Sequence, residues 1–169
     1  DCDKDHVDAL LRGLKAHDIN MCAITDHDCF DKDLYYALKE REGDGCLNKV
    51  LPGIEFSVSI RAGGKKPIVV HIVAIFDDRH PDLIDGIAEV VCDENGKPRY
   101  DDLNIGAFTE DGFTKVLRDI GLNAVLIGHE KSAGQEAKRD VSSLGANCAS
   151  EGILTEFVDA VEIRNNRRE

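Results

Sequence analysis

Two expected strands of this chain end in side chains of the kinds that bind metal ions. The first is an apolar run over residues 21–24 that leads into Asp26 and His27, and the second leads through Gly53 to Glu55. Imidazole nitrogens and carboxylate oxygens are donors that zinc, manganese and iron accept. Because α/β proteins carry their chemistry at the carboxyl ends of strands, we expect both endings to contribute to one metal site.

Two further histidines belong to apolar segments. His71 is the only polar side chain in residues 68–76, and His129 follows Gly128 directly after the apolar run 125–127. A lone core histidine can instead hydrogen-bond a neighbour. The other strand endings of ligand type favour metal binding, and the small Gly128 lets the backbone approach a ligand closely.

The two carboxylates have different expected roles. Glu55 lies in an apolar strand, where an uncompensated charge is unfavourable, so we expect it to bridge two metal ions; a solvent-facing position on an edge strand is the alternative. Asp26 is expected beside a ligand imidazole, with the N-cap of the next helix as its alternative. We therefore expect Asp26, Glu55 and His129 to take part in catalysis. The remaining histidines are expected at the surface: His6, His17 and His80.

Composition limits the class of protein. A chain of 169 residues with 42% hydrophobic and 32% charged residues predicts one globular domain over residues 1–169. It has no apolar run long enough to cross a membrane and no signal peptide, which predicts a cytoplasmic protein without a membrane partner. The six cysteines form no C-x-x-C pair, so reduced thiols are expected rather than disulfides or a zinc ribbon.

The net charge of −12 argues against binding nucleic acid by unaided phosphate attraction. A phosphate substrate would need a local positive centre in such an acidic chain. Bound divalent metal ions supply one, which agrees with the clustered His, Asp and Glu side chains.

Alternating helices and strands are expected to position these residues. The apolar periodicity and the capping residues predict helices over 5–17, 31–42, 81–91 and 109–120, with further helical turns in 132–143 and 153–158. Strands are predicted for 21–26, 50–60, 68–76, 123–127 and 160–163, the second and third of these forming a hairpin. Residues 92–104 predict an exposed loop or a small hairpin.

Four motifs in order resemble the polymerase and histidinol phosphatase (PHP) superfamily. They are Ala23-Ile24-Thr25-Asp26-His27, Pro52-Gly53-Ile54-Glu55, Val70-His71-Ile72-Val73-Ala74 and Ile127-Gly128-His129. The resemblance implies an α/β fold, a distorted β/α barrel, that holds two or three divalent metal ions, usually zinc, manganese or iron. On this resemblance the metal ligands are His27, Glu55, His71 and His129.

The resemblance also implies a metal-dependent hydrolase of phosphate esters. In this mechanism a metal-bound hydroxide attacks phosphorus in line while a second metal neutralises the leaving oxygen. The substrate is expected to be a phosphomonoester, a nucleotide or a nucleic-acid end. Lys131 and Arg164 could contact phosphate oxygens, and surface solvation is the alternative for both.

Some features of the family pattern are missing from this sequence. No His-x-His motif precedes Asp5, no Asp-x-His motif follows Arg164, and Glu130 stands where a proline is usual. We therefore expect an internal piece of a longer protein, without the first strand and the last one or two. A fused domain, such as a P-loop ATPase, could then bring nucleic acid to the site.

Two other functions remain open on the sequence alone. A noncatalytic PHP-like regulatory or scaffold domain of a larger protein would keep the fold and lose metal ligands. A metal hydrolase that cleaves C–N bonds on a related barrel would use the same ligand types. No motif specifies the oligomeric state.

Overall fold

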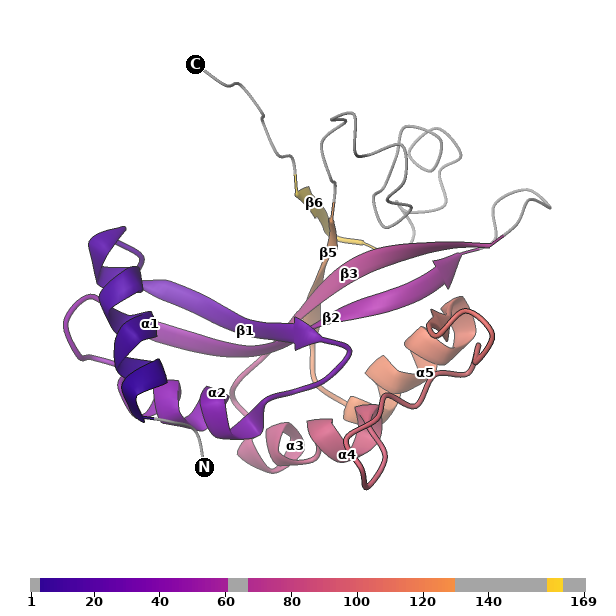
Figure 1. Cartoon of the computed structure of the whole chain (residues 1–169), viewed down its shortest axis with the longest axis horizontal. Coiled ribbons are helices and arrows are strands. Elements are labelled where there is room, and N and C mark those ends of the chain that lie inside the picture. Colours follow the sequence, from indigo (N-terminus) through magenta and orange to yellow (C-terminus); the bar gives the residue numbers. More distant parts are fainter. Residues whose placement is uncertain (1–3, 61–66, 130–157, 163–169) are drawn as a thin grey trace, which may run out of the picture.

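The computed structural model describes residues 4–60, 67–129 and 158–162. These residues form a mixed α/β structure in which helices and strands alternate (Figure 1). The helices are α1 (Lys4–Ala16), α2 (Lys32–Lys39), α3 (Pro81–Asp85), α4 (Ile87–Val91) and α5 (Glu110–Ile120). The strands are β1 (Met21–His27), β2 (Lys49–Ile60), β3 (Ile68–Phe76), β4 (Phe108–Thr109), β5 (Ala124–His129) and β6 (Ala160–Glu162).

The strands build one mixed sheet in the order β1-β2-β3-β5-β6, and β4 pairs with β2 beside this path. β1 is parallel to β2, whereas β2 and β3 are antiparallel and form the expected hairpin. β3 is antiparallel to β5, and β5 is parallel to β6. Within the described residues the sheet is open, with β1 and β6 at the ends of the strand order, so these strands form no closed barrel.

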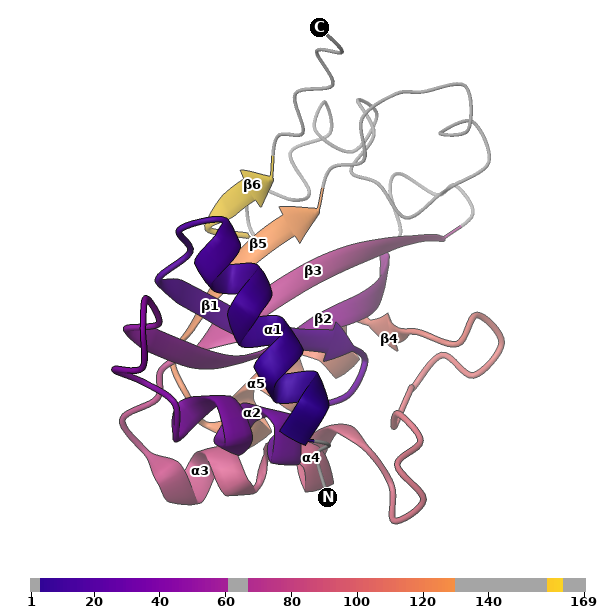
Figure 2. The same ribbon diagram turned by 60° about the vertical axis from the view of Figure 1, so that its left-hand side comes forward.

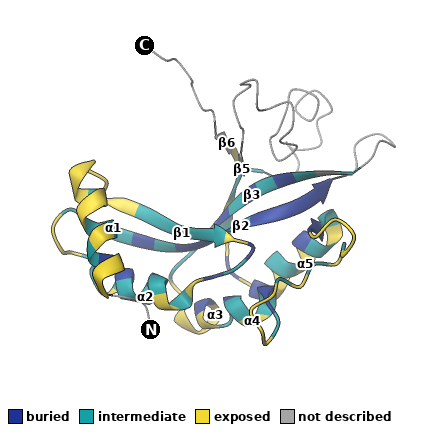
Figure 3. Cartoon of the chain, viewed as in Figure 1, coloured by how far each residue is buried: buried dark blue, intermediate teal, exposed yellow. Residues whose placement is uncertain are grey.

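One face of the sheet carries the core. In β2 the side chains of Ile54, Phe56 and Val58 are at most 1% exposed, and the ring of Phe56 lies 5.2 Å from that of Phe113 in α5. Helices α2 to α5 gather below the sheet in Figure 1, and the turned view in Figure 2 agrees. Figure 3 shows this buried layer in β2 and β3, while much of α1 is exposed. Because side chains alternate along a strand, the residues between these apolar ones point to the opposite face.

Local signals explain the helix boundaries. The Asp31 side chain accepts a hydrogen bond from Leu34 N at 2.8 Å and caps α2, and Thr109 caps α5 in the same way. Gly121 ends α5 with a φ of 73°, a left-handed conformation that glycine adopts readily. The helix expected over 81–91 is divided at Gly86 into α3 and α4. The helical turns expected in 132–143 and 153–158 lie outside the described residues, apart from residue 158.

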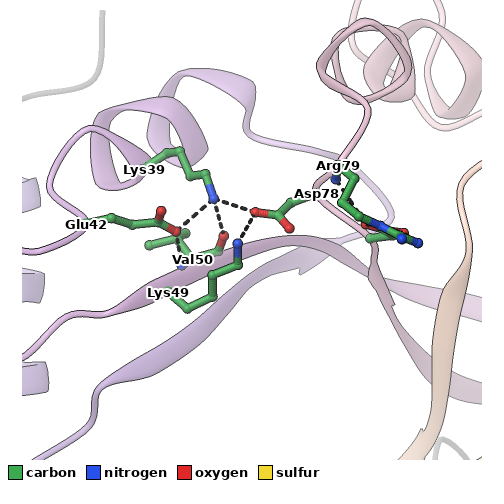
Figure 4. A network of polar contacts seen from close by, with 7 residues as sticks. Lys39, Glu42, Lys49, Val50, Asp78 and Arg79 are labelled. Atoms are coloured by element: carbon green, nitrogen blue, oxygen red, sulfur yellow. Dashed lines mark hydrogen bonds and ion pairs between the residues drawn. The ribbon is translucent and has the colours of Figure 1, made fainter.

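A polar network joins α2, β2 and the turn after β3 (Figure 4). Lys39 Nζ donates to Asp78 Oδ2 at 2.5 Å and to Glu42 Oε1 at 2.8 Å, and Lys49 Nζ also lies 2.5 Å from Asp78. The Glu42 carboxylate accepts a hydrogen bond from Val50 N at 2.7 Å. These contacts hold the beginning of β2 in place, before the part of the strand that carries Glu55.

The structure also bears on two expectations from composition. No helix in the described ranges is long and apolar enough to cross a membrane. Four cysteines within these ranges have free thiols: Cys22, Cys29, Cys46 and Cys92.

Candidate metal centre

Backbone pairing brings three of the expected ligands together. His27 in β1 is paired with Glu55 in β2, and Ser57, two residues further along β2, is paired with His71 in β3. Residues paired across neighbouring strands share a face, and residues two apart in one strand do too. His27, Glu55 and His71 therefore share the face opposite the helices. His27 ends β1 as expected, whereas Glu55 lies within β2, which continues to Ile60, and not at a strand end.

The imidazole rings of His27 and His71 face each other. Their Nε2 atoms lie 3.4 Å apart, with ring centroids 4.8 Å apart and an interplanar angle of 64°. Zinc–nitrogen bonds are about 2.0 to 2.1 Å long, so two nitrogens on one tetrahedral ion lie about 3.3 to 3.4 Å apart. The observed separation fits two imidazole ligands of a single ion.

Each of these rings has a carboxylate beside its other nitrogen. His71 Nδ1 lies 2.9 Å from Glu55 Oε1, and His27 Nδ1 lies 3.2 Å from Asp28 Oδ2. A carboxylate at Nδ1 favours the proton on that nitrogen and leaves the Nε2 lone pair for a metal ion.

Asp28 is a buried carboxylate held by several donors. Asp28 is 1% exposed, and its Oδ1 accepts a hydrogen bond from Ser57 N at 2.6 Å. Its Oδ2 accepts from Ser57 Oγ at 2.7 Å and from the Tyr100 hydroxyl at 2.9 Å. These hydrogen bonds compensate for the loss of water around the charge.

The backbone at Asp28 explains how this side chain reaches the face of His27. Strict strand alternation would direct residue 28 to the opposite face from His27. Asp28 instead adopts a φ of 54°, in the left-handed region, and its N–H donates to Glu55 O at 2.9 Å. Aspartate is among the few residue types that adopt this conformation with a modest penalty. The chain therefore turns at the end of β1 and places the carboxylate under the imidazole.

Ser57 contacts both His27 and Asp28, which raises the question of a nucleophilic serine. Its Oγ lies 3.1 Å from His27 Nε2 and 2.7 Å from Asp28 Oδ2. The shorter contact favours donation of the hydroxyl proton to the carboxylate rather than to the imidazole, and Ser57 is only 4% exposed. Ser57 therefore holds the Asp28 carboxylate in place, and its hydroxyl is too buried to attack a substrate.

Asp26 lies on the other face of the sheet from His27. It is paired with Ile54, a core residue, and its Oδ2 is buried without a hydrogen-bond partner among the described residues. Burial, followed by the charge of Asp31, raises the pKa of the Asp26 carboxyl. The alternative role of Asp26, as the N-cap of the next helix, is wrong, because Asp31 caps α2. Its role in catalysis stays a prediction.

The position of His129 agrees with the expected strand ending. The backbone pairing of β3 with β5 ends at Ile72 and Gly128, the chain neighbours of His71 and His129. Residue 129 is paired with Glu162 in β6. The register of β3 and β5 therefore leads to residue 129 beside residue 71, which is paired with Ser57 in β2.

The described side chains bring two candidate metal donors together. Within the described ranges, no group of three or more His, Cys, Asp and Glu side chains is arranged to hold a metal ion. His27 and His71 are the two facing donors. The histidines expected at the surface are exposed: His6, His17 and His80. Glu130, Lys131 and Arg164 lie outside the described residues.

Sequence reasoning did not identify Ser57 and Tyr100. Ser57 stands two residues after Glu55 in the same strand, so strand alternation alone could have placed it on the face of the site. Tyr100 is 72 residues from Asp28 in the chain, and no local pattern connects them.

Comparison with known proteins identifies no relative. No protein-family model, curated protein or solved structure matches this chain.

Proposed function

We propose that this chain is a metal-dependent hydrolase of phosphate esters, with the β/α barrel architecture of the PHP superfamily. The observation that carries the proposal is the 3.4 Å separation between the Nε2 atoms of His27 and His71, each with a carboxylate at its Nδ1. Paired imidazoles oriented by carboxylates are typical of catalytic metal sites. The ordered motifs that resemble the PHP superfamily support the same function.

In this proposal His27 and His71 bind the metal through Nε2, and His129 and Glu55 complete the ligand set. Glu55 has one carboxylate oxygen at His71 Nδ1, so it also orients that ring. Two or three ions of zinc, manganese or iron suit this mixture of imidazole and carboxylate donors. When bound, such ions act as Lewis acids and lower the pKa of water, which suits hydrolysis without a side-chain nucleophile.

The chain itself contributes orientation and access. Asp28 holds His27 from the buried side, while 54% of the His27 side chain is exposed and open to a substrate. The His71 and Glu55 side chains are 21% and 25% exposed, so the site lies at the surface of the sheet rather than in the core. This access suits a phosphomonoester, a nucleotide or a nucleic-acid end.

Metal binding is the first test. The chain would be purified without chelators for elemental analysis, then stripped and titrated with zinc, alongside His27→Ala, His71→Ala and the exposed control His80→Ala. We expect zinc binding in the wild type and the control, and its loss in the two site variants. Equal zinc affinity in all four proteins would contradict the proposal.

Activity is the second test. The metal-loaded wild type would be assayed against an aryl phosphate, a nucleotide and a set of amides. Phosphate release that disappears in His71→Ala supports the proposal, whereas amide cleavage alone would assign the chain to the C–N hydrolases.

The alternative is a noncatalytic regulatory or scaffold domain. The observation that favours it is that the described side chains bring two imidazoles together rather than three or more ligands. A wild type that binds no metal ion would support this alternative.

A further inference from the structure

We propose that Tyr100 is a positioning residue for His27 and acts through the Asp28 carboxylate. This inference rests on the proposed function in one respect, since His27 matters most if it binds a metal ion. Its structural content, the orientation and tautomer of the His27 ring, can be measured in the metal-free protein.

The contacts form a continuous chain. The Tyr100 hydroxyl donates to Asp28 Oδ2 at 2.9 Å, and the same oxygen lies 3.2 Å from His27 Nδ1. The Nε2 atom on the other side of the His27 ring lies 3.4 Å from His71 Nε2 and 3.1 Å from Ser57 Oγ. The hydroxyl of Tyr100 is thus connected to the metal-binding nitrogen through one carboxylate and one imidazole.

Tyr100 is itself well anchored. Its ring lies 5.2 Å from that of Phe108, a core residue, in an edge-on arrangement. Arg99, the residue before Tyr100, is held by two hydrogen bonds. Its main-chain N donates to Val91 O at 2.9 Å, and its side-chain Nε donates to Cys92 O at 2.8 Å. The hydroxyl therefore has a defined place relative to the sheet.

The Asp28 carboxylate depends on its donors for its orientation. At 1% exposure it has little access to water that could replace a lost hydrogen bond. Ser57 supplies two of the bonds from β2, and Tyr100 supplies a third from a separate segment of the chain. Without the third bond the carboxylate is held from one side only and can turn away from the imidazole.

The protonation state of Tyr100 suits this role. Burial, and then the hydrogen bond to Asp28, raise the pKa of the Tyr100 hydroxyl. The group therefore remains a neutral donor at physiological pH. A purely structural tyrosine would satisfy Asp28 without affecting the imidazole, so the proton distribution of His27 separates the two roles.

The experiment compares Tyr100→Phe with the matched control Tyr36→Phe. Tyr36 also donates its hydroxyl to a carboxylate, Asp85 Oδ1 at 3.0 Å, but belongs to α2 on the core face. Chelator-treated protein labelled with 15N-histidine would be studied by long-range proton–nitrogen NMR, about two pH units above the ordinary histidine pKa of about 6.5. The His27 signals would be assigned from their absence in His27→Ala.

We expect the wild type to carry the His27 proton on Nδ1. Ser57 Oγ, which donates to Asp28, offers an acceptor to His27 Nε2 at 3.1 Å and so competes with Asp28 for the ring proton. In Tyr100→Phe we expect the ratio of the Nδ1–H form to the Nε2–H form to fall by about twofold to tenfold, the range of one hydrogen bond. Asp28→Asn should lower the ratio further, and Tyr36→Phe should leave it unchanged. An unchanged ratio in Tyr100→Phe overturns the proposal. A wild type that carries the His27 proton on Nε2 also overturns it, and this measurement does not depend on the folding of any variant.

Zinc titration of the same proteins keeps this inference separate from the proposed function. If the wild type binds no zinc but Tyr100→Phe still alters the tautomer ratio, the positioning role stands and the proposed hydrolase is wrong. If the wild type binds zinc, we expect Tyr100→Phe to weaken zinc binding by about tenfold, the lower end of the range for losing an outer partner of a ligand. Unchanged zinc affinity together with an unchanged tautomer ratio leaves the hydrolase proposal standing and removes Tyr100 from it.

Discussion

Nε2 of His27 lies 3.4 Å from Nε2 of His71, although 44 residues separate the two histidines in the chain. The strand between them accounts for this contact, because β2 is paired with β1 on one side and with β3 on the other. Glu55 and Ser57 in β2 are paired with His27 and His71, respectively. The facing imidazoles are therefore a consequence of strand register, and changes that disturb the register should disturb the site.

Gly53 tests the packing of this central strand. A Cβ atom on residue 53 would lie 2.8 Å from Ala74 O and 3.0 Å from Thr25 Cγ2, closer than packed atoms tolerate. We expect Gly53→Ala to lower the free energy of unfolding by about 1 to 3 kcal/mol, measured by urea denaturation. The control is Gly13→Ala in α1, where a Cβ meets nothing within 4 Å and alanine should stabilise the helix by about 0.5 to 1 kcal/mol. Equal effects of the two substitutions would show that the close approach at Gly53 is unimportant.

Glu55 tests the orientation of His71. Glu55→Gln keeps the shape of the side chain but removes the charge 2.9 Å from His71 Nδ1. We expect zinc affinity to fall by about 10-fold to 100-fold, with little change in thermal stability. Isothermal titration would measure the affinity, with Glu89→Gln at an exposed position of α4 as the control. Wild-type affinity in Glu55→Gln would exclude Glu55 from the site.

Asp78 tests the network that holds the beginning of β2. Its side chain is 12% exposed and lies 2.5 Å from the amines of Lys39 and Lys49. Asp78→Ala leaves both amines without this partner, and we expect a loss of about 2 kcal/mol in unfolding free energy. Asp85→Ala is the comparison. Asp85 forms an ion pair with Lys32 in which both side chains are exposed, and this pair should contribute about 0 to 1 kcal/mol. A larger loss in Asp85→Ala would reverse this ranking.

The same carboxylate predicts a dependence of stability on pH. Partial burial alone would raise the pKa of Asp78, but hydrogen bonds from Lys39 and Lys49 outweigh burial and hold it below its usual value. A group with a lowered pKa in the folded state stabilises the protein above its unfolded pKa, about 3.9 for aspartate. This stabilisation is lost as the pH falls through the lower folded pKa. The difference in unfolding free energy between wild type and Asp78→Ala should therefore be largest near neutral pH and shrink below about pH 4. A difference that is constant down to pH 2 would contradict this account.

Much of the local structure was predictable from sequence. The capping signals at Asp31 and Thr109 mark the beginnings of α2 and α5, and the apolar run 68–76 marks β3. The split at Gly86 was not predicted, because a single glycine within a helical pattern does not show whether the helix continues. The closed barrel implied by the family resemblance is not formed by the described strands.

The site was predictable in its residue types and less so in its geometry. The expected strand endings at His27 and Glu55, together with the lone polar His71 in an apolar segment, pointed to one location, and the register places them on one face. The turn at Asp28 depends on a left-handed backbone that no pattern in the sequence specifies. The contact with Tyr100 depends on the path of a loop 72 residues away, which only the three-dimensional structure shows.

The contacts of Asp28 also bear on the order of folding. The hairpin of β2 and β3 is local in sequence, so Glu55 and His71 can meet early. His27 and Asp28 join them through hydrogen bonds to residues 29 and 72 positions away, which require a larger part of the chain to be collapsed. We therefore expect the His27 ring to reach its orientation later in folding than Glu55 and His71 reach each other, so the geometry of the two imidazoles is a property of the fully folded chain.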